Sequence, residues 1–173
     1  MNLLQKDGYR LRAPEPEDLD CMLQFENTPS LWEVSNATGP YSRFYLKQYI
    51  ETNKNDLYTD GQLRLMIESP LKEVVGIIDL FNFDPFHNRA EVGIVIAENY
   101  RRQGIGKLAL ELLLVHSFHY LGIRQIYAYI DVTNEACRQL FHQCKFKECA
   151  YLKDWMRTGT SYRDVVMVQR INS

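Results

Sequence analysis

The segment Tyr100–Lys107 holds the residues best suited to bind an anion. Its sequence, Y-R-R-Q-G-I-G-K, lies between a strand-like apolar run and a helix-like apolar run. Glycines at the start of a helix let the backbone approach a ligand closely, and the first N–H groups of a helix have no partner within it. The pattern therefore predicts a phosphate or pyrophosphate site. The alternative interpretation is that Gly104 and Gly106 only permit a tight turn.

A single acidic side chain interrupts the apolar run before this segment. Residues 90–97 read A-E-V-G-I-V-I-A and are apolar on both faces except at Glu91, which favours a central strand covered on both sides. One role open to this carboxylate is a salt bridge with Arg89 or another basic group. Gly93 within this strand indicates a bulge or a close backbone approach.

Two common phosphate-binding patterns fit the segment less well. A nucleoside-triphosphate P-loop needs G-x-x-x-x-G-K-[ST], but Arg101 takes the place of its first glycine and Leu108 that of its hydroxyl residue. The dinucleotide pattern G-x-G-x-x-A fits residues 104–109, and Asp131 follows 25 positions after Gly106 (131 minus 106). In that fold, however, the first glycine follows the first strand almost at once, whereas here six residues intervene and the strand is the fourth.

A third pattern fits throughout. The residues from Arg101 to Gly106 match the [RQ]-x-x-G-x-[GA] loop of the GNAT acetyltransferases, and the chain resembles that family from Tyr9 to about Arg170. Residues 134–141, N-E-A-C-R-Q-L-F, followed by Phe146, resemble the family segment N-x-x-A-x-x-x-Y-x-x-x-G-F, with a cysteine in place of the alanine. The ending, residues 149–171, resembles the branch that contains spermidine and ribosomal-protein acetyltransferases.

Hydrophobic periodicity predicts the elements that position these residues. Strands are expected at residues 9–13, 63–68, 74–83, 90–97 and 123–130, with a final hairpin of 149–155 and 162–171. Helices are expected from residue 14, from Ser42, over 104–121 and over 134–144. Their apolar faces are Leu19, Met22, Leu23 and Phe25 in the first helix and Phe44, Tyr45, Tyr49 and Ile50 in the second.

The element order βααβββαβαββ indicates an α/β protein with a right-handed crossover between two parallel strands, 90–97 and 123–130. The family resemblance implies the GNAT fold. This fold has a mixed, mostly antiparallel seven-stranded sheet, whose central parallel strand pair is splayed to hold acetyl-CoA, and about four flanking helices. We expect residues 1–173 to form a single acetyltransferase domain.

Composition limits the partners and the compartment. The 173 residues carry a net charge of −2, which argues against nucleic-acid binding by bulk charge. The chain has no apolar run of membrane-spanning length and no signal-peptide pattern, so we expect a cytoplasmic protein. Its four cysteines, Cys21, Cys137, Cys144 and Cys149, lack C-x-x-C spacing; they indicate reduced core thiols and no metal site.

The resemblance implies acetyl-CoA as co-substrate and assigns the site residues. The pantetheine would pair with the strand backbone at 94–96, the pyrophosphate would contact the N–H groups of 101–107, and the amide of Asn134 would hold the pantetheine arm. Glu91 is the candidate catalytic base, acting through water. The expected cofactor-binding residues are Ile94, Val95, Ile96, Arg101, Arg102, Gln103, Gly104, Ile105, Gly106, Lys107, Asn134 and Phe141.

The sequence departs from the family at two positions of the late helix. Phe141 replaces the tyrosine that protonates the leaving thiolate, and Lys145 replaces a helix-ending glycine whose backbone is left-handed. The acids that hold a polyamine are also few, because Asn82 stands where one is expected and residues 31–45 offer only Glu33. Aromatic side chains of that stretch are candidates for the acceptor pocket or for the core; they are Trp32, Tyr41 and Tyr45.

The expected function is acetyl transfer from acetyl-CoA to a primary amine, either a small amine or polyamine or a protein or peptide N-terminus. No nucleic-acid or membrane partner is expected, and the chain is a candidate homo-oligomer. Phe141 favours one alternative, a catalytically weak acyl-CoA-binding or sensing domain. A dinucleotide-binding domain is the third hypothesis.

Overall fold

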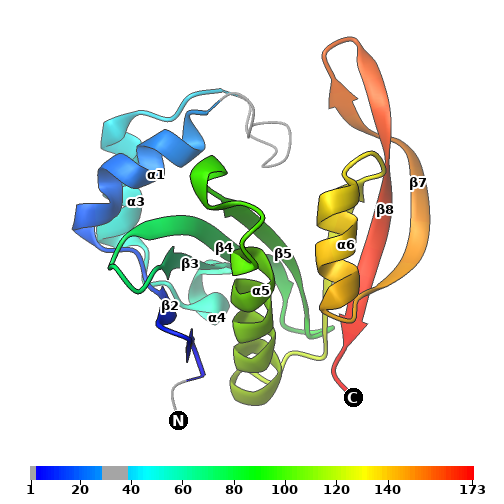
Figure 1. The fold of residues 1–173 in the computed structure, drawn as a ribbon, viewed down its shortest axis with the longest axis horizontal. Coiled ribbons are helices and arrows are strands. Elements are labelled where there is room, and N and C mark those ends of the chain that lie inside the picture. The colour runs from blue at the N-terminus through cyan, green and yellow to red at the C-terminus, as the bar shows by residue number, and fades with distance from the viewer. Residues whose placement is uncertain (1–2, 29–38) are drawn as a thin grey trace.

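The computed structural model describes residues 3–28 and 39–173, and its centre is one eight-stranded sheet (Figure 1). The strand order is β1-β2-β3-β4-β5-β6-β8-β7, and β5 and β6 form its parallel pair. The strands are β1 (Gln5–Lys6), β2 (Tyr9–Arg12), β3 (Leu63–Glu68), β4 (Val74–Asp84), β5 (Arg89–Ile96), β6 (Gln125–Asp131), β7 (Lys147–Thr158) and β8 (Ser161–Ile171).

Five α-helices are present in the described ranges: α1 (Leu19–Glu26), α3 (Arg43–Thr52), α4 (Leu57–Asp60), α5 (Ile105–Val115) and α6 (Glu135–Gln143). Short turns of other helix types precede or extend them: η1 (Pro16–Asp18), η2 (Glu98–Tyr100) and the π-helical turn η3 (His116–Tyr120). Among the described residues, no helix has the length and apolar character needed to cross a membrane.

The sheet separates two hydrophobic clusters. Alternate residues of a strand point to opposite faces. Ala90 and Val92 of β5 belong to the larger cluster, which includes the buried residues of α5, whereas Val95 packs against the smaller cluster formed by α1, α3, β3 and β4. Glu91 alternates with Ala90 and Val92, so it lies on the sheet face opposite α5.

The helix boundaries follow from local chemistry. The Ser42 hydroxyl accepts a hydrogen bond from Tyr45 N (3.0 Å) and caps α3. At the end of the helical segment that begins with α5, Gly122 has a φ of +68°, a left-handed conformation that suits glycine. Both boundaries were predicted.

The predicted fold is confirmed, with differences in detail. The additional strand is β1, which has only two residues and no alternation to reveal it, and the four-residue helix α4 was not predicted. The buried face expected for α3 is wrong at Phe44 and Tyr45, which are 68% and 53% exposed, because Leu46 takes the buried position beside Tyr49 and Ile50. Residues 46, 49 and 50 share one side of a helix, from which 45 is rotated by about 100°.

The four cysteines were expected to be reduced thiols in the core, and one of them is fully buried. All four cysteines are free; Cys144 is buried and Cys21 and Cys137 are half-buried. Cys149 is exposed, so the prediction is wrong there. It lies on β7, which pairs on one side only, with β8, and is exposed along most of its length.

Candidate active site

The predicted anion-binding segment forms the loop between β5 and α5. Two of its residues have left-handed backbone, Arg102 with a φ of +63° and Gly104 with a φ of +79°. The first backbone hydrogen bond of α5 runs from Leu108 N to Gly104 O (3.1 Å), so the amides of residues 105–107 precede it. No side chain caps this helix end. Left-handed loop residues beside the first amides of a helix form an anion-binding concavity.

The two glycines of this loop have different roles. A Cβ on Gly104 would meet no atom within 4 Å, so glycine is favoured here by its left-handed backbone and not by lack of space. The space beside this residue is open to a ligand. A Cβ on Gly106 would lie 3.4 Å from Leu140 Cδ2, an ordinary van der Waals contact, so this position faces α6 and has room for a Cβ. The tight-turn interpretation therefore applies to Gly104, without excluding ligand contact.

The side chains of the loop divide into structural and exposed ones. Arg101 Nε donates to Ile96 O (3.0 Å), and Gln103 Nε2 donates to Asn99 O (3.2 Å), which fixes the loop on the end of β5. Ile105 is buried in the larger cluster, so only its backbone faces the loop. Arg102 and Lys107 are exposed cations that remain available to an anion.

The parallel strands β5 and β6 separate beside this loop. They pair only at Arg89–Gln125, Ala90–Ile126 and Glu91–Tyr127. Beyond Glu91, β5 continues to Ile96 paired with β4, and β6 continues to Asp131 paired with β8. We call this divergence beyond the Glu91–Tyr127 pair the fork. Alternate peptide groups on its two edges face away from the neighbouring antiparallel strands, so the predicted positions Ile94, Val95 and Ile96 offer backbone donors and acceptors to a ligand.

Gly93 lies on the edge of the fork, and the side chain of Phe81, not a bulge, accounts for the glycine there. A Cβ at this position would lie 3.2 Å from Phe81 Cε1 of β4, so the close approach is made by an aromatic ring. The bulge in this part of the sheet is in β4, between Phe81 and Asp84. The expectation of a bulge at Gly93 is therefore wrong, and the close approach of a ligand to its backbone stays a prediction.

Glu91 is half-buried at the end of the pairing between β5 and β6. Its Oε1 accepts a hydrogen bond from Asn82 Nδ2 (3.2 Å). Burial raises the pKa of Glu91, and the hydrogen bond from Asn82 opposes that rise. Arg89 pairs with Asp84 instead (3.6 Å), so the alternative of a salt bridge between Glu91 and Arg89 is wrong. A carboxylate with a raised pKa is better matched to accept a proton near neutral pH.

Helix α6 carries the other predicted residues. Asn134 Oδ1 accepts from Cys137 N (3.1 Å) and caps the helix, so a pantetheine contact would use Nδ2. Phe141 is 2% exposed, and its ring packs edge-on against Phe146 with centroids 4.8 Å apart. Lys145 has a φ of +66°, which confirms the predicted left-handed position without glycine.

Three aromatic side chains on the Glu91 face were not singled out from the sequence. Tyr127 pairs with Glu91 at the base of the fork. The Tyr127 ring lies 5.9 Å from that of Tyr129, and the Tyr129 ring lies 5.6 Å from that of Trp155. Only the register between neighbouring strands shows that these side chains lie near Glu91, and a single sequence does not give that register. Of the expected acceptor aromatics, Tyr41 and Tyr45 stack at 5.3 Å, and Trp32 lies outside the described residues, as does Glu33.

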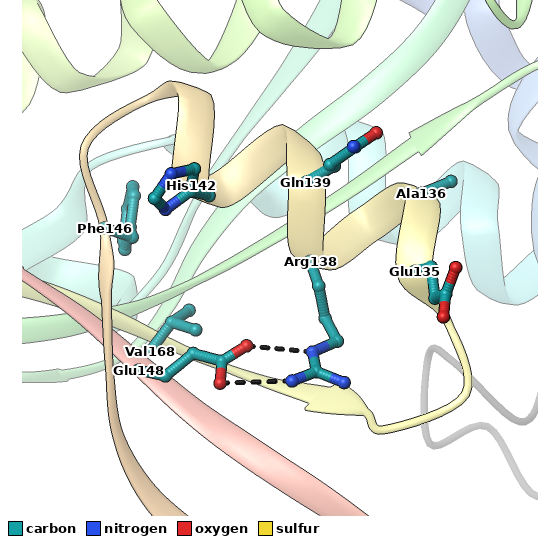
Figure 2. Close-up of a pocket in the computed structure, with 8 residues that line it drawn as sticks. All are labelled: Glu135, Ala136, Arg138, Gln139, His142, Phe146, Glu148 and Val168. Atoms are coloured by element: carbon teal, nitrogen blue, oxygen red, sulfur yellow. Dashed lines mark hydrogen bonds and ion pairs between the residues drawn. The ribbon is translucent and has the colours of Figure 1, made fainter.

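A hollow of about 560 Å³ lies elsewhere, between α6 and the β7–β8 hairpin (Figure 2). Arg138 and Glu148 form a two-bond ion pair across it, at 2.8 and 3.1 Å. None of the predicted site residues lines this hollow. It is therefore separate from the fork.

The family profile described as "Acetyltransferase (GNAT) domain" matches residues 9–147. The chain belongs to the GNAT acetyltransferase family. It is accordingly an N-acetyltransferase, and enzymes of this family use acetyl-CoA as the acetyl donor. The dinucleotide-binding hypothesis is wrong. Asp131, at the position where a dinucleotide-binding fold has its ribose-binding acid, instead pairs with Arg163 (2.9 Å).

Comparison with known proteins confirms the predicted resemblance to spermidine acetyltransferases. The spermidine N(1)-acetyltransferase of Vibrio cholerae is 25% identical over 155 residues, which cover 90% of this chain and 88% of that protein. The Escherichia coli K12 enzyme of the same name is 24% identical over 159 residues, covering 92% and 83%. The crystal structure of the Vibrio cholerae enzyme with CoA and spermine superposes with a TM-score of 0.87 at 22% identity, covering 96% of this chain and 97% of that one.

The described residues fit the acetyl donor. The basic loop, the uncapped start of α5 and the open space at Gly104 suit a pyrophosphate, and the free edges of the fork suit an amide-containing arm. Figure 1 shows α5 and α6 on the same side of the sheet, and the contact between Gly106 and Leu140 joins them. The loop, Ile94–Ile96 and α6 are thus brought together, whereas Glu91 lies on the other face at the base of the fork.

Proposed function

We propose that this enzyme acetylates a primary amine at the fork, with Glu91 as the general base. The observation that carries the proposal is that pairing between β5 and β6 stops at Glu91, a half-buried carboxylate on the face opposite α5. The backbone amides of residues 101–107 and the exposed side chains of Arg102 and Lys107 hold the pyrophosphate. The peptide groups of Ile94–Ile96 and the amide of Asn134 hold the pantetheine arm. Phe141 lies beside it on α6.

The chemistry sets three tasks for the protein. Bound acetyl-CoA supplies an activated thioester. An alkylammonium with a pKa near ~10.4 must lose its proton before it is a nucleophile, and Glu91 accepts that proton through water. Backbone N–H groups on the fork edge stabilise the negative charge that builds on the carbonyl oxygen. The leaving thiolate needs a proton, which Phe141 has no group to supply, so we expect slower turnover than with tyrosine at this position.

The acceptor class is a primary amine on a small molecule, a polyamine or a peptide N-terminus. Sequence similarity to spermidine N(1)-acetyltransferases supports a polyamine. One observation argues against a polyamine. Position 82 has an amide where an acid that holds a polyamine was expected, and this amide lies beside the carboxylate of Glu91 at the base of the fork. A second candidate function is acyl-CoA sensing with little turnover, which the buried ring of Phe141 favours.

The compartment and assembly state are part of the same proposal. The four free thiols, one of them exposed, suit the reducing cytoplasm. All eight strands belong to one sheet, so we treat residues 1–173 as one catalytic domain. A structure of the Vibrio cholerae enzyme is dodecameric, and we propose a homo-oligomer here, which light scattering after size-exclusion chromatography tests directly. Neither nucleic acid nor membrane is proposed as a partner.

The decisive experiment compares wild type with Glu91→Gln. Thiol release from acetyl-CoA is measured with a panel of spermidine, short diamines, arylalkylamines and peptides. Wild type should release CoA with at least one amine, and Glu91→Gln should lower kcat/KM for that amine by about 10²-fold or more, with acetyl-CoA affinity unchanged within a few-fold. Binding of acetyl-CoA without thiol release on any amine would favour sensing. Full activity of Glu91→Gln across about pH 6 to 9 would exclude Glu91 as the base.

A further inference from the structure

The β-bulge in β4 places one side chain beside Glu91. Phe81 pairs with Glu91 and Asp84 pairs with Arg89, so Asn82 and Phe83 together oppose only Ala90. Asn82 has a φ of +49°, a left-handed conformation that asparagine adopts more readily than most residues. Bulges with one left-handed residue re-aim side chains and are frequent next to active sites.

The re-aimed side chain reaches the carboxylate of Glu91. Asn82 Nδ2 lies 3.2 Å from Glu91 Oε1, and the nitrogen must be the atom that faces it, because an ionised carboxylate only accepts hydrogen bonds. Within residues 3–28 and 39–173, this is the one side-chain hydrogen bond to Glu91. It engages Oε1, and Oε2 is the oxygen left to accept a proton.

Among the residues described, the other titratable groups near Glu91 do not donate a hydrogen bond to its carboxylate. Tyr127 faces it from β6, and the pKa of that phenol is raised by burial first and by the charge of Glu91 second, so it stays neutral. Tyr129 lies further along β6. Arg89 and Asp84, at the end of the bulge, neutralise each other.

On the basis of the proposed function, we propose that Asn82 is a positioning residue, which holds Glu91 Oε1 so that Oε2 faces the acceptor amine. In the step it supports, the N–H bond of the ammonium breaks and the proton passes through one water to Glu91 Oε2. The nitrogen keeps the electron pair with which it attacks the acetyl carbon. Asn82 contacts neither reactant; it acts through Glu91.

An amide suits this position better than an acid. A carboxylate at residue 82 would place a second negative charge about as close to Glu91 Oε1 as the present amide nitrogen, and like charges at that separation raise the pKa of one partner strongly. The two carboxyl groups would then compete for one proton, and Glu91 would be less available as a free carboxylate. The amide donates a hydrogen bond and adds no charge.

The test uses two substitutions that keep the left-handed backbone. Asn82→Gly removes the amide, because glycine tolerates a positive φ, and Asn82→Asp replaces the donor with a charge at nearly the same volume. Asn88→Gly is the matched control. Asn88 also has a left-handed φ, +56°, but its Nδ2 donates to Gly122 O (2.8 Å), away from Glu91.

Two measurements are made on each folded variant. The first is the NMR titration of the Glu91 side-chain carboxyl in the free enzyme, assigned with Glu91→Gln. The second is the pH profile of kcat/KM for the best amine. We expect the Glu91 pKa and the acidic limb to move upward together in Asn82→Gly, and further in Asn82→Asp, with kcat/KM on that limb lowered roughly threefold or more. Asn88→Gly should behave as wild type, and Asn82→Asp should have no pH effect in a Glu91→Gln background.

The outcomes separate this inference from the proposed function. If wild type acetylates an amine and Glu91→Gln loses the acidic limb, but the Asn82 variants titrate as wild type does, the role of Asn82 is refuted and the function stands. If no amine is acetylated, the function fails, and the NMR titration still reports whether Asn82 controls the carboxylate. An equal shift in Asn88→Gly would show a general effect of loosening the sheet and would also refute the inference.

Discussion

Replacing Gly104 with valine tests the cofactor loop through its backbone. A Cβ at this residue would meet nothing within 4 Å, so steric contact with the protein is not the expected cost of the substitution. The cost comes from the φ of +79°. A left-handed conformation costs an ordinary residue about 1–2 kcal/mol, and more when the side chain is β-branched. The variant should relax to a different loop conformation, in which the amides of residues 105–107 no longer converge.

Binding must then restore the original loop conformation, and that free energy is subtracted from the affinity. At 1.4 kcal/mol per tenfold change, we expect acetyl-CoA to bind Gly104→Val at least about tenfold more weakly than wild type. Gly104→Asn is the matched control, because asparagine tolerates left-handed backbone, and its loss should be smaller. Isothermal titration calorimetry measures both, with circular dichroism to show that the variants fold.

Two results would refute this reasoning. Unchanged affinity in folded Gly104→Val would show that the loop does not bind the donor. Equal losses in the valine and asparagine variants would show that the side chain blocks the ligand in the open space above Gly104, independently of φ.

The remaining predictions concern α6 and Glu91. Phe141→Tyr should raise kcat roughly threefold to thirtyfold if thiolate protonation limits turnover, measured by steady-state rates from about pH 6 to 10; melting temperature is recorded in parallel, because a buried hydroxyl without a partner costs about 1–3 kcal/mol. A gain that persists above the pKa of the phenol would contradict a proton-donor role. Lys145→Gly should stabilise the protein by about 0.5–1 kcal/mol, since glycine adopts the left-handed backbone without strain; urea denaturation checks this, and a destabilised variant would show that the lysine side chain contributes more than the strain costs. Glu91→Gln should be more stable than wild type at pH values above the raised pKa of Glu91. The folded pKa of this carboxyl exceeds its ordinary value of 4.5, so its ionisation lowers the stability of wild type as pH rises from 4.5 through the folded pKa. Glutamine does not ionise and removes this loss. The difference should vanish below pH 4.5, and a constant difference at all pH values would refute this origin.

Sequence patterns predicted the elements around the donor loop because each carries a local signal. Gly104 requires positive φ and Ser42 caps a helix, and both signals depend only on neighbours in the chain. The alternation of apolar and polar residues along a strand and the apolar composition of α5 can likewise be recognised in a single sequence. The late left-handed position at Lys145 was recognised from a motif, although the residue itself disfavours that conformation.

The acceptor side was harder to predict because it depends on register. Nothing in the local sequence states that Asn82 is displaced by a bulge towards Glu91, or that Tyr127 faces Glu91 from the next parallel strand. The alternative of a salt bridge between Glu91 and Arg89 is wrong for a related reason. Two residues apart on one strand, they share a face, but Asp84 on the neighbouring strand lies closer to the guanidinium.

The topology explains why the predicted donor residues gather at one edge. In a parallel pair, the carboxyl ends of both strands point the same way, and ligands bind beyond those ends. The loop after β5 leads into α5 and the loop after β6 leads into α6, so both helix N-termini lie at that edge, where the fork opens. Antiparallel β4 and β8 hold the two strands from outside, which satisfies one edge of each and leaves the inner edges for a ligand. Because Glu91 marks the closed end of the fork and faces away from α5, donor and acceptor should approach from opposite faces of the sheet and meet between the strands. An amine acceptor should therefore not compete with CoA for the loop at Gly104, and product inhibition by CoA should be competitive with acetyl-CoA alone.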